Sequence, residues 1–147
     1  MSALVYLYAV ARADAAAWLE RNQLRGIGDA RVRGVAEGAL SGAASEVPAE
    51  DFEQEPLDRN VADPAWLEPR AAAHQTVNAA LLEGLGAVLP LAFGTIYRAE
   101  DGVRRLLRER AADLEAALAR AAGHVEWVVS LQRDPDAAAA YLAAGEI

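Results

Sequence analysis

The chain has 147 residues, a length typical of one domain with a single hydrophobic core. It contains no cysteine, which excludes disulfides, thiolate metal sites and cysteine nucleophiles. Its formal net charge is −8, and an acidic chain without a basic block is not expected to bind nucleic acid.

Residues 4–10 are a continuous run of β-branched, aromatic and aliphatic side chains, which predicts a strand buried on both faces. The run is too short for a membrane span, and no basic residue precedes it, so we expect neither a signal peptide nor a membrane helix. Residues 14–24 then predict a short helix that ends before Gly26 and Gly28.

Residues 31–47 predict a β-hairpin with its turn near Glu37-Gly38. The acidic stretch 48–60 is poor in apolar residues and is typical of a surface loop with at most one helical turn. A helix begins at Asp63-Pro64, or restarts at Glu68-Pro69, because an interior proline removes a backbone hydrogen bond.

Residues 88–93 predict another strand, and its proline, which cannot donate to a ladder, indicates an edge position or a bulge. The clearest helical periodicity covers residues 101–122, with acidic residues four positions before arginines at its start. The alternation in residues 125–131 predicts a last strand.

This element order predicts an α+β fold, a ferredoxin-like variant with a mainly antiparallel four- to five-stranded sheet and two longer helices on one face. We expect one domain over residues 1–134 and a short helix or tail over 135–147. The apolar positions expected in the core are Leu7, Val77, Leu91, Leu107, Leu114, Leu118 and Trp127.

Several segments resemble the gas vesicle F/L (GvpF/GvpL) family, in the family's order. They are Tyr6-Leu7-Tyr8, Asp63-Pro64-Ala65-Trp66-Leu67-Glu68-Pro69-Arg70, Leu89-Pro90-Leu91-Ala92-Phe93-Gly94-Thr95 and Gly123-His124-Val125-Glu126-Trp127. The resemblance extends from about residue 4 to 131. Ala92 departs from the resemblance, because an arginine is expected there. The sequence also ends at Ile147, whereas family members usually continue into a second domain, so we expect either one domain of a longer protein or a short family member.

The resemblance implies a non-enzymatic accessory protein of gas vesicle assembly, located at the vesicle in the cytoplasm. Its implied partners are the small apolar shell protein and other gas vesicle accessory proteins, and no cofactor is implied. A different class, a ferredoxin-like regulatory domain that binds a small ligand, fits the same element order. An enzyme is disfavoured because no nucleophile and base are suggested together.

Few side chains suggest a metal, cofactor or catalytic site. His74 and His124 lie far apart without a second histidine at metal-ligand spacing, so we expect a surface or half-buried structural role for His74 and no metal. Gly26-Ile27-Gly28 lacks the third glycine of a dinucleotide fingerprint and is typical of a turn. We expect the acids of the 46–58 segment to be solvated, although an acid/base pair or cation site is the alternative.

An interaction surface is expected on the sheet. Two strands are apolar on both sides, and if both longer helices cover one face, the other face must be covered by something else. The candidates are a second domain, a second copy of the chain as a homodimer, or shell protein. The residues expected there are Tyr6, Tyr8, Phe93 and Arg98.

Overall fold

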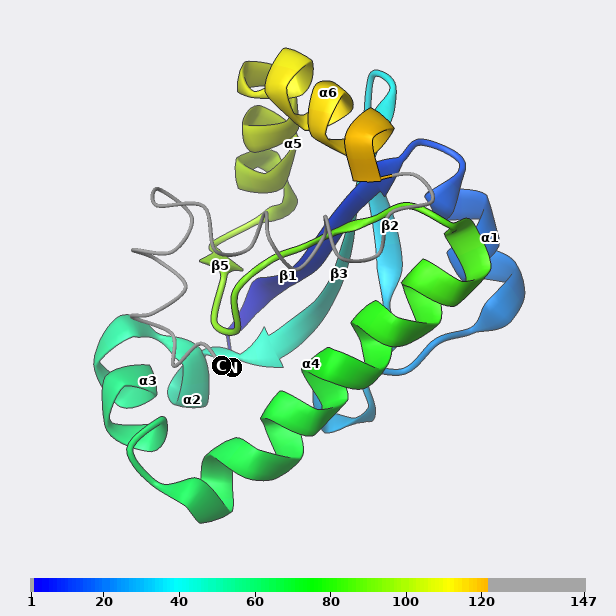
Figure 1. Ribbon diagram of the computed structural model, residues 1–147. Helices are drawn as coiled ribbons and strands as arrows, with labels where there is room; N and C mark the ends of the chain where they lie inside the picture. The colour runs from blue at the N-terminus through cyan, green and yellow to red at the C-terminus, as the bar shows by residue number, and fades with distance from the viewer. Residues whose placement is uncertain (1, 122–147) are drawn as a thin grey trace.

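The computed structural model describes residues 2–121, which form a five-stranded antiparallel sheet flanked by helices (Figure 1). The strand order is β2-β3-β1-β4, and β5 pairs with β1 on the same edge as β4. The expected α+β class with an antiparallel sheet is therefore confirmed. The strands are β1 (Ala3–Arg12), β2 (Arg33–Glu37), β3 (Leu40–Pro48), β4 (Leu89–Pro90) and β5 (Ile96–Tyr97).

The central strand β1 is buried on both faces, as its apolar run predicts. Its ladder with β3 shifts register between Leu7 and Ala9, where an irregularity of the β-bulge kind changes which side chains share a face. Leu4, Tyr6 and Tyr8 contribute to one core cluster, whereas Val5, Leu7 and Val10 contribute to the other.

The predicted hairpin is confirmed as β2 and β3, with a turn that contains Gly38 at a φ of 61°. Glycine suits this position because left-handed backbone costs it nothing. The strand expected over residues 88–93 is reduced to the two residues of β4, and the next strand to pair with β1 is β5. Pro90 does lie on an edge strand, as expected.

One face of the sheet is covered by α1 (Ala15–Asn22) and α4 (Pro64–Leu85). The Asp63 carboxylate accepts a hydrogen bond from the Ala65 amide at 3.0 Å and caps α4 at its N-terminus. The helix continues through Pro69, so the alternative start at Glu68-Pro69 is wrong. The 3₁₀ turn Ile27–Asp29 occupies the glycine-rich segment that was expected to be a turn.

The acidic stretch after β3 is helical, which corrects the expected loop. It forms α2 (Ala49–Phe52) and α3 (Gln54–Asn60), separated at Glu53. Phe52 is 2% exposed and fixes this segment against the core. One buried aromatic residue thus compensates for the low apolar content of the segment.

The expected single helix over residues 101–122 is two helices, α5 (Glu100–Glu109) and α6 (Ala111–Ala121). The break is at Arg110, whose φ of −109° and ψ of 18° are not helical. An unbroken helix of this length would extend about 30 Å in one direction. The break returns α6 to the sheet, where Leu118 is fully buried.

The longer helices lie on opposite faces, so the expectation that both cover one face is wrong (Figure 1). Val77 and Leu81 of α4 pack with Tyr6 and Tyr8, whereas α5 and α6 pack with Leu7 on the other side. Of the expected core residues, Leu91 and Leu114 are half-buried, and Leu7, Val77, Leu107 and Leu118 are fully buried.

The strand expected over residues 125–131, with Trp127, and the tail over 135–147 lie outside the described residues. Within residues 2–121, no helix is long and apolar enough to span a bilayer.

Candidate functional site

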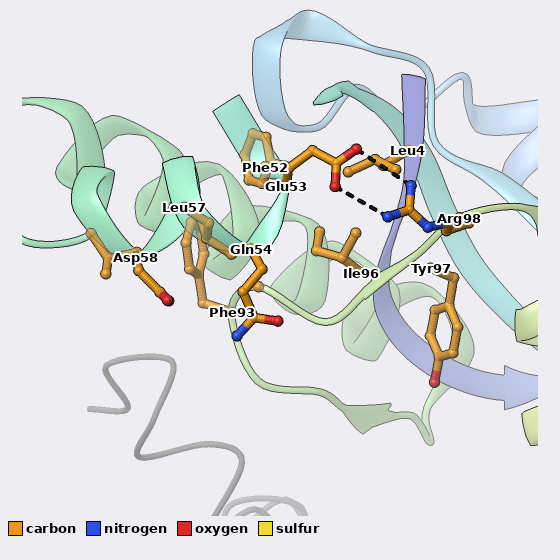
Figure 2. Close-up of a pocket in the computed structure, with 12 residues that line it drawn as sticks. Leu4, Phe52, Glu53, Gln54, Leu57, Asp58, Phe93, Ile96, Tyr97 and Arg98 are labelled. Carbon is orange, nitrogen blue, oxygen red and sulfur yellow. Dashed lines mark hydrogen bonds and ion pairs between the residues drawn. The ribbon is translucent and has the colours of Figure 1, made fainter. Parts of the chain in front are cut away.

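A pocket of about 390 Å³ opens between α2–α3 and the β5 edge of the sheet (Figure 2). Leu4, Phe52 and Phe93 contribute buried side chains to it, and Leu57 and Ile96 are half-buried. The polar part comes from residues whose side chains reach solvent. The full lining is Leu4, Phe52, Glu53, Gln54, Leu57, Asp58, Val61, Phe93, Gly94, Ile96, Tyr97 and Arg98.

An ion pair joins the two sides of this pocket. Nη1 and Nη2 of Arg98 each donate to a carboxylate oxygen of Glu53 at 3.3 Å, as Figure 2 shows. The side chains are 81% and 40% exposed, respectively, so water screens the pair. The contact links the α2–α3 junction to the residue that follows β5, across 45 positions of the chain.

The loop between β4 and β5 forms one wall of the pocket and is held from inside the protein. Thr95 Oγ1 donates to the Ala92 carbonyl at 2.7 Å, and Gly94 adopts a φ of 88°. The Gly94 amide donates to the Tyr6 hydroxyl at 3.1 Å. A strand residue in the core therefore fixes the backbone of a surface loop.

The same hydroxyl belongs to a buried polar chain that includes His74 of α4. The Tyr6 hydroxyl lies 2.8 Å from His74 Nδ1, and His74 Nε2 lies 2.9 Å from the Leu91 carbonyl oxygen. A carbonyl only accepts, so Nε2 must carry the proton and donate. Nδ1 of the neutral ring then accepts from the tyrosine hydroxyl.

Burial explains the protonation states in this chain of contacts. Burial lowers the pKa of His74 from 6.5 to about 4, against the opposing effect of its bond to Leu91. Burial also raises the pKa of Tyr6 well above its usual value, so the phenol keeps its proton. Both residues are neutral near pH 7, which favours a structural role over proton transfer with solvent. His74 is 7% exposed, which corrects the expected surface or half-buried position.

A second buried contact set surrounds Tyr8. Its hydroxyl accepts from the Ile27 amide at 2.9 Å and lies 2.8 Å from Ser45 Oγ. Asn78 Nδ2 donates to the Tyr8 carbonyl at 3.3 Å. These contacts connect β1 to β3, to the glycine-rich turn and to α4.

The four residues expected at an interface separate into two groups. Tyr6 and Tyr8 are 0% exposed beneath α4, so the premise of an uncovered sheet face is wrong. Phe93 and Arg98 both line the pocket, Phe93 in its buried part and Arg98 at the surface. The sequence alone does not single out Glu53, Leu57 and Ile96 as neighbours of these two, because they come from segments that only the fold brings together.

The acidic segment forms no metal site in the described part of the chain, where no cluster of three or more His, Cys, Asp or Glu residues could hold an ion. Glu53 instead pairs with Arg98. The acidic residues four positions before arginines in this helix predict the pairs Glu100–Arg104 and Asp101–Arg105. The first pair is present at 3.0 Å, but Asp101 pairs with Arg104 instead of Arg105.

A family model described as gas vesicle synthesis protein GvpL/GvpF matches residues 4–146. Gas vesicle protein L of Streptomyces sp. (strain CB03234) is 38% identical over 135 residues, which cover 92% of this chain and 50% of that protein. The chain therefore spans about half the length of this relative.

Two solved structures share the fold. The crystal structure of gas vesicle protein GvpF from Anabaena sp. PCC7120 superposes with a TM-score of 0.60 at 21% identity, covering 81% of this chain and 43% of that one. GvpF from Microcystis aeruginosa gives a TM-score of 0.52 at 17% identity, covering 80% and 43%.

Proposed function

Because the chain belongs to the GvpL/GvpF family of gas vesicle synthesis proteins, we propose that it acts in gas vesicle assembly by binding the small vesicle shell protein. The observation that carries this proposal is the family match over residues 4–146 together with 38% identity to a gas vesicle protein L. The α+β fold shared with two GvpF structures agrees with it.

The structure supports a binding role over a catalytic one. The buried histidine and tyrosines are neutral and bonded to one another or to backbone, and none of these groups lines the pocket. The pocket is formed by apolar side chains, the exposed Glu53–Arg98 pair, and the side chains of Gln54, Asp58 and Tyr97. We propose that the protein is not an enzyme, needs no cofactor and acts at the vesicle in the cytoplasm, where other vesicle accessory proteins are further partners.

Co-expression of the affinity-tagged chain with the small shell protein, followed by pull-down, tests the proposal. We expect shell protein to be retained well above the level obtained with an equally tagged, unrelated acidic domain. Retention at the control level, by both this chain and the longer Streptomyces gas vesicle protein L, would overturn shell binding. Mass spectrometry of washed floating vesicles then shows whether the protein remains in the finished vesicle.

A further inference from the structure

We propose that the pocket between α2–α3 and β5 is the docking site for the shell protein, and that it receives one apolar shell side chain with a basic residue beside it. This assignment rests on the proposed function and adds the site and the chemistry of contact. The partner's basic residue takes the place of Arg98 on Glu53.

The floor of the pocket is apolar and aromatic. Phe52 and Phe93 are 2% and 7% exposed and form an aromatic group with Trp66, with ring centroids 5.3 Å and 6.4 Å from that indole. Leu57 and Ile96 border the opening with half-buried side chains. An apolar side chain inserted here would cover surface that now contacts water.

The segment that forms one wall of the pocket is acidic. Between residues 49 and 60, the five acids Glu50, Asp51, Glu53, Glu55 and Asp58 are accompanied by a single basic residue, Arg59. On the opposite wall, Arg98 neutralises Glu53 alone. Of these acids, Glu53 and Asp58 line the pocket, where Arg98 is the one basic residue among the described residues of the lining. This excess of negative charge favours a basic partner and disfavours an acidic one.

The Glu53–Arg98 pair can be exchanged without disturbing the fold. Both side chains are substantially exposed, and exposed pairs contribute little to stability because water and salt screen them. The loop beneath is held independently by the Tyr6 hydroxyl and the His74 contact to Leu91. The pocket is therefore preformed, and a partner's arginine or lysine can replace Arg98 at low cost.

Three variants with one matched control test the assignment in the shell protein pull-down. Glu53→Arg should reduce retained shell protein by about tenfold, and Leu57→Ala by several-fold, because they remove the charge and the apolar contact separately. Arg98→Gln should leave retention equal to or above that of the wild type, because Glu53 loses a competing partner. The control is Glu20→Arg, the same charge reversal at an exposed residue of α1 that pairs with Arg31.

Melting temperature and circular dichroism show whether each variant is folded, and Glu53→Gln replaces Glu53→Arg if the reversal destabilises the chain. If the wild type and Glu20→Arg retain shell protein and the folded Glu53 and Leu57 variants retain as much, the pocket assignment fails while the proposed function stands. The pocket assignment also fails if Glu20→Arg reduces retained shell protein as much as the Glu53 variant does. If neither the wild type nor the longer Streptomyces gas vesicle protein L retains shell protein, the proposed function fails and the assignment fails with it.

Discussion

Tyr6 and Tyr8 of β1 bring hydroxyl groups into an otherwise apolar layer, and each hydroxyl has partners. Tyr6 contacts His74 and the Gly94 amide, and Tyr8 contacts Ser45 and the Ile27 amide. Because an unpaired buried donor or acceptor is costly, these bonds restrict how α4, the glycine-rich turn and the β4–β5 loop can pack on the sheet. The same residues that fill the core therefore determine the shape of a surface pocket.

The buried His74 should make stability depend on pH. Its pKa is about 4 in the folded chain and about 6.5 when unfolded, so the unfolded state binds more protons between these values. The contribution is present above pH 6.5 and is lost as the pH falls toward 4. Between pH 7.5 and pH 5, we expect urea denaturation to show a loss about 2 kcal/mol larger for the wild type than for His74→Gln. Equal losses in the two proteins would show that the ring binds its proton as readily in the folded chain as in the unfolded chain.

Removal of the Tyr8 hydroxyl should destabilise the protein. Tyr8→Phe leaves the Ile27 amide and Ser45 without their partner, which we expect to lower the free energy of unfolding by about 1–3 kcal/mol. Tyr97→Phe is the matched control, because Tyr97 is half-buried and its hydroxyl has no hydrogen bond among the described residues. Its effect should stay within about 0.5 kcal/mol in the same chemical denaturation. Equal effects of the two substitutions would count against this role for Tyr8.

At the level of elements, the sequence correctly predicts helices, strands and turns that have a strong local signal. It fails for those elements whose formation depends on tertiary contacts. The apolar run of β1, the hairpin turn at Gly38 and the Asp63 cap are local and are confirmed. The helices α2 and α3 depend on the packing of Phe52 in the core. The break at Arg110 depends on the packing of α6 against the sheet. For the same reason the sequence predicts Phe93 and Arg98 as interface residues but not the pocket that they share with Glu53.

Because of the contact between α1 and α4, replacing a helical glycine with alanine should here destabilise the protein instead of stabilising it. Gly84 lies in α4, where alanine normally adds about 1 kcal/mol of stability. A Cβ at Gly84 would overlap the Trp18 indole of α1, so the ring has to leave its packed position. We expect Gly84→Ala to lower the melting temperature in the wild type and to raise it in a Trp18→Ala background. A double-mutant cycle by thermal denaturation measures this change of sign, and additive effects would exclude the contact.

At the scale of the whole molecule, the strand β1 contributes side chains to both hydrophobic clusters of the core. Side chains of β1 belong to the cluster under α4 and to the cluster under α5 and α6, and β1 pairs with β3, β4 and β5. Neither cluster has a sheet of its own. Damage to one face should therefore reach the other through β1, and the described part of the chain should unfold as one cooperative unit.

A substitution in α5 should thus be detected by tryptophans on the opposite face. Leu107 is fully buried in the cluster under α5 and α6, and replacing such a leucine with alanine typically costs about 2–5 kcal/mol. Trp18 and Trp66 pack against the other cluster, and a Trp127→Phe background leaves them as the only indoles of the chain. In that background, we expect Leu107→Ala to lower the midpoints of the fluorescence and circular dichroism transitions by the same amount. The control is Arg105→Ala, because Arg105 is exposed on the same helix. A fluorescence midpoint that stays at its original value while the circular dichroism midpoint falls would show that the two faces unfold separately.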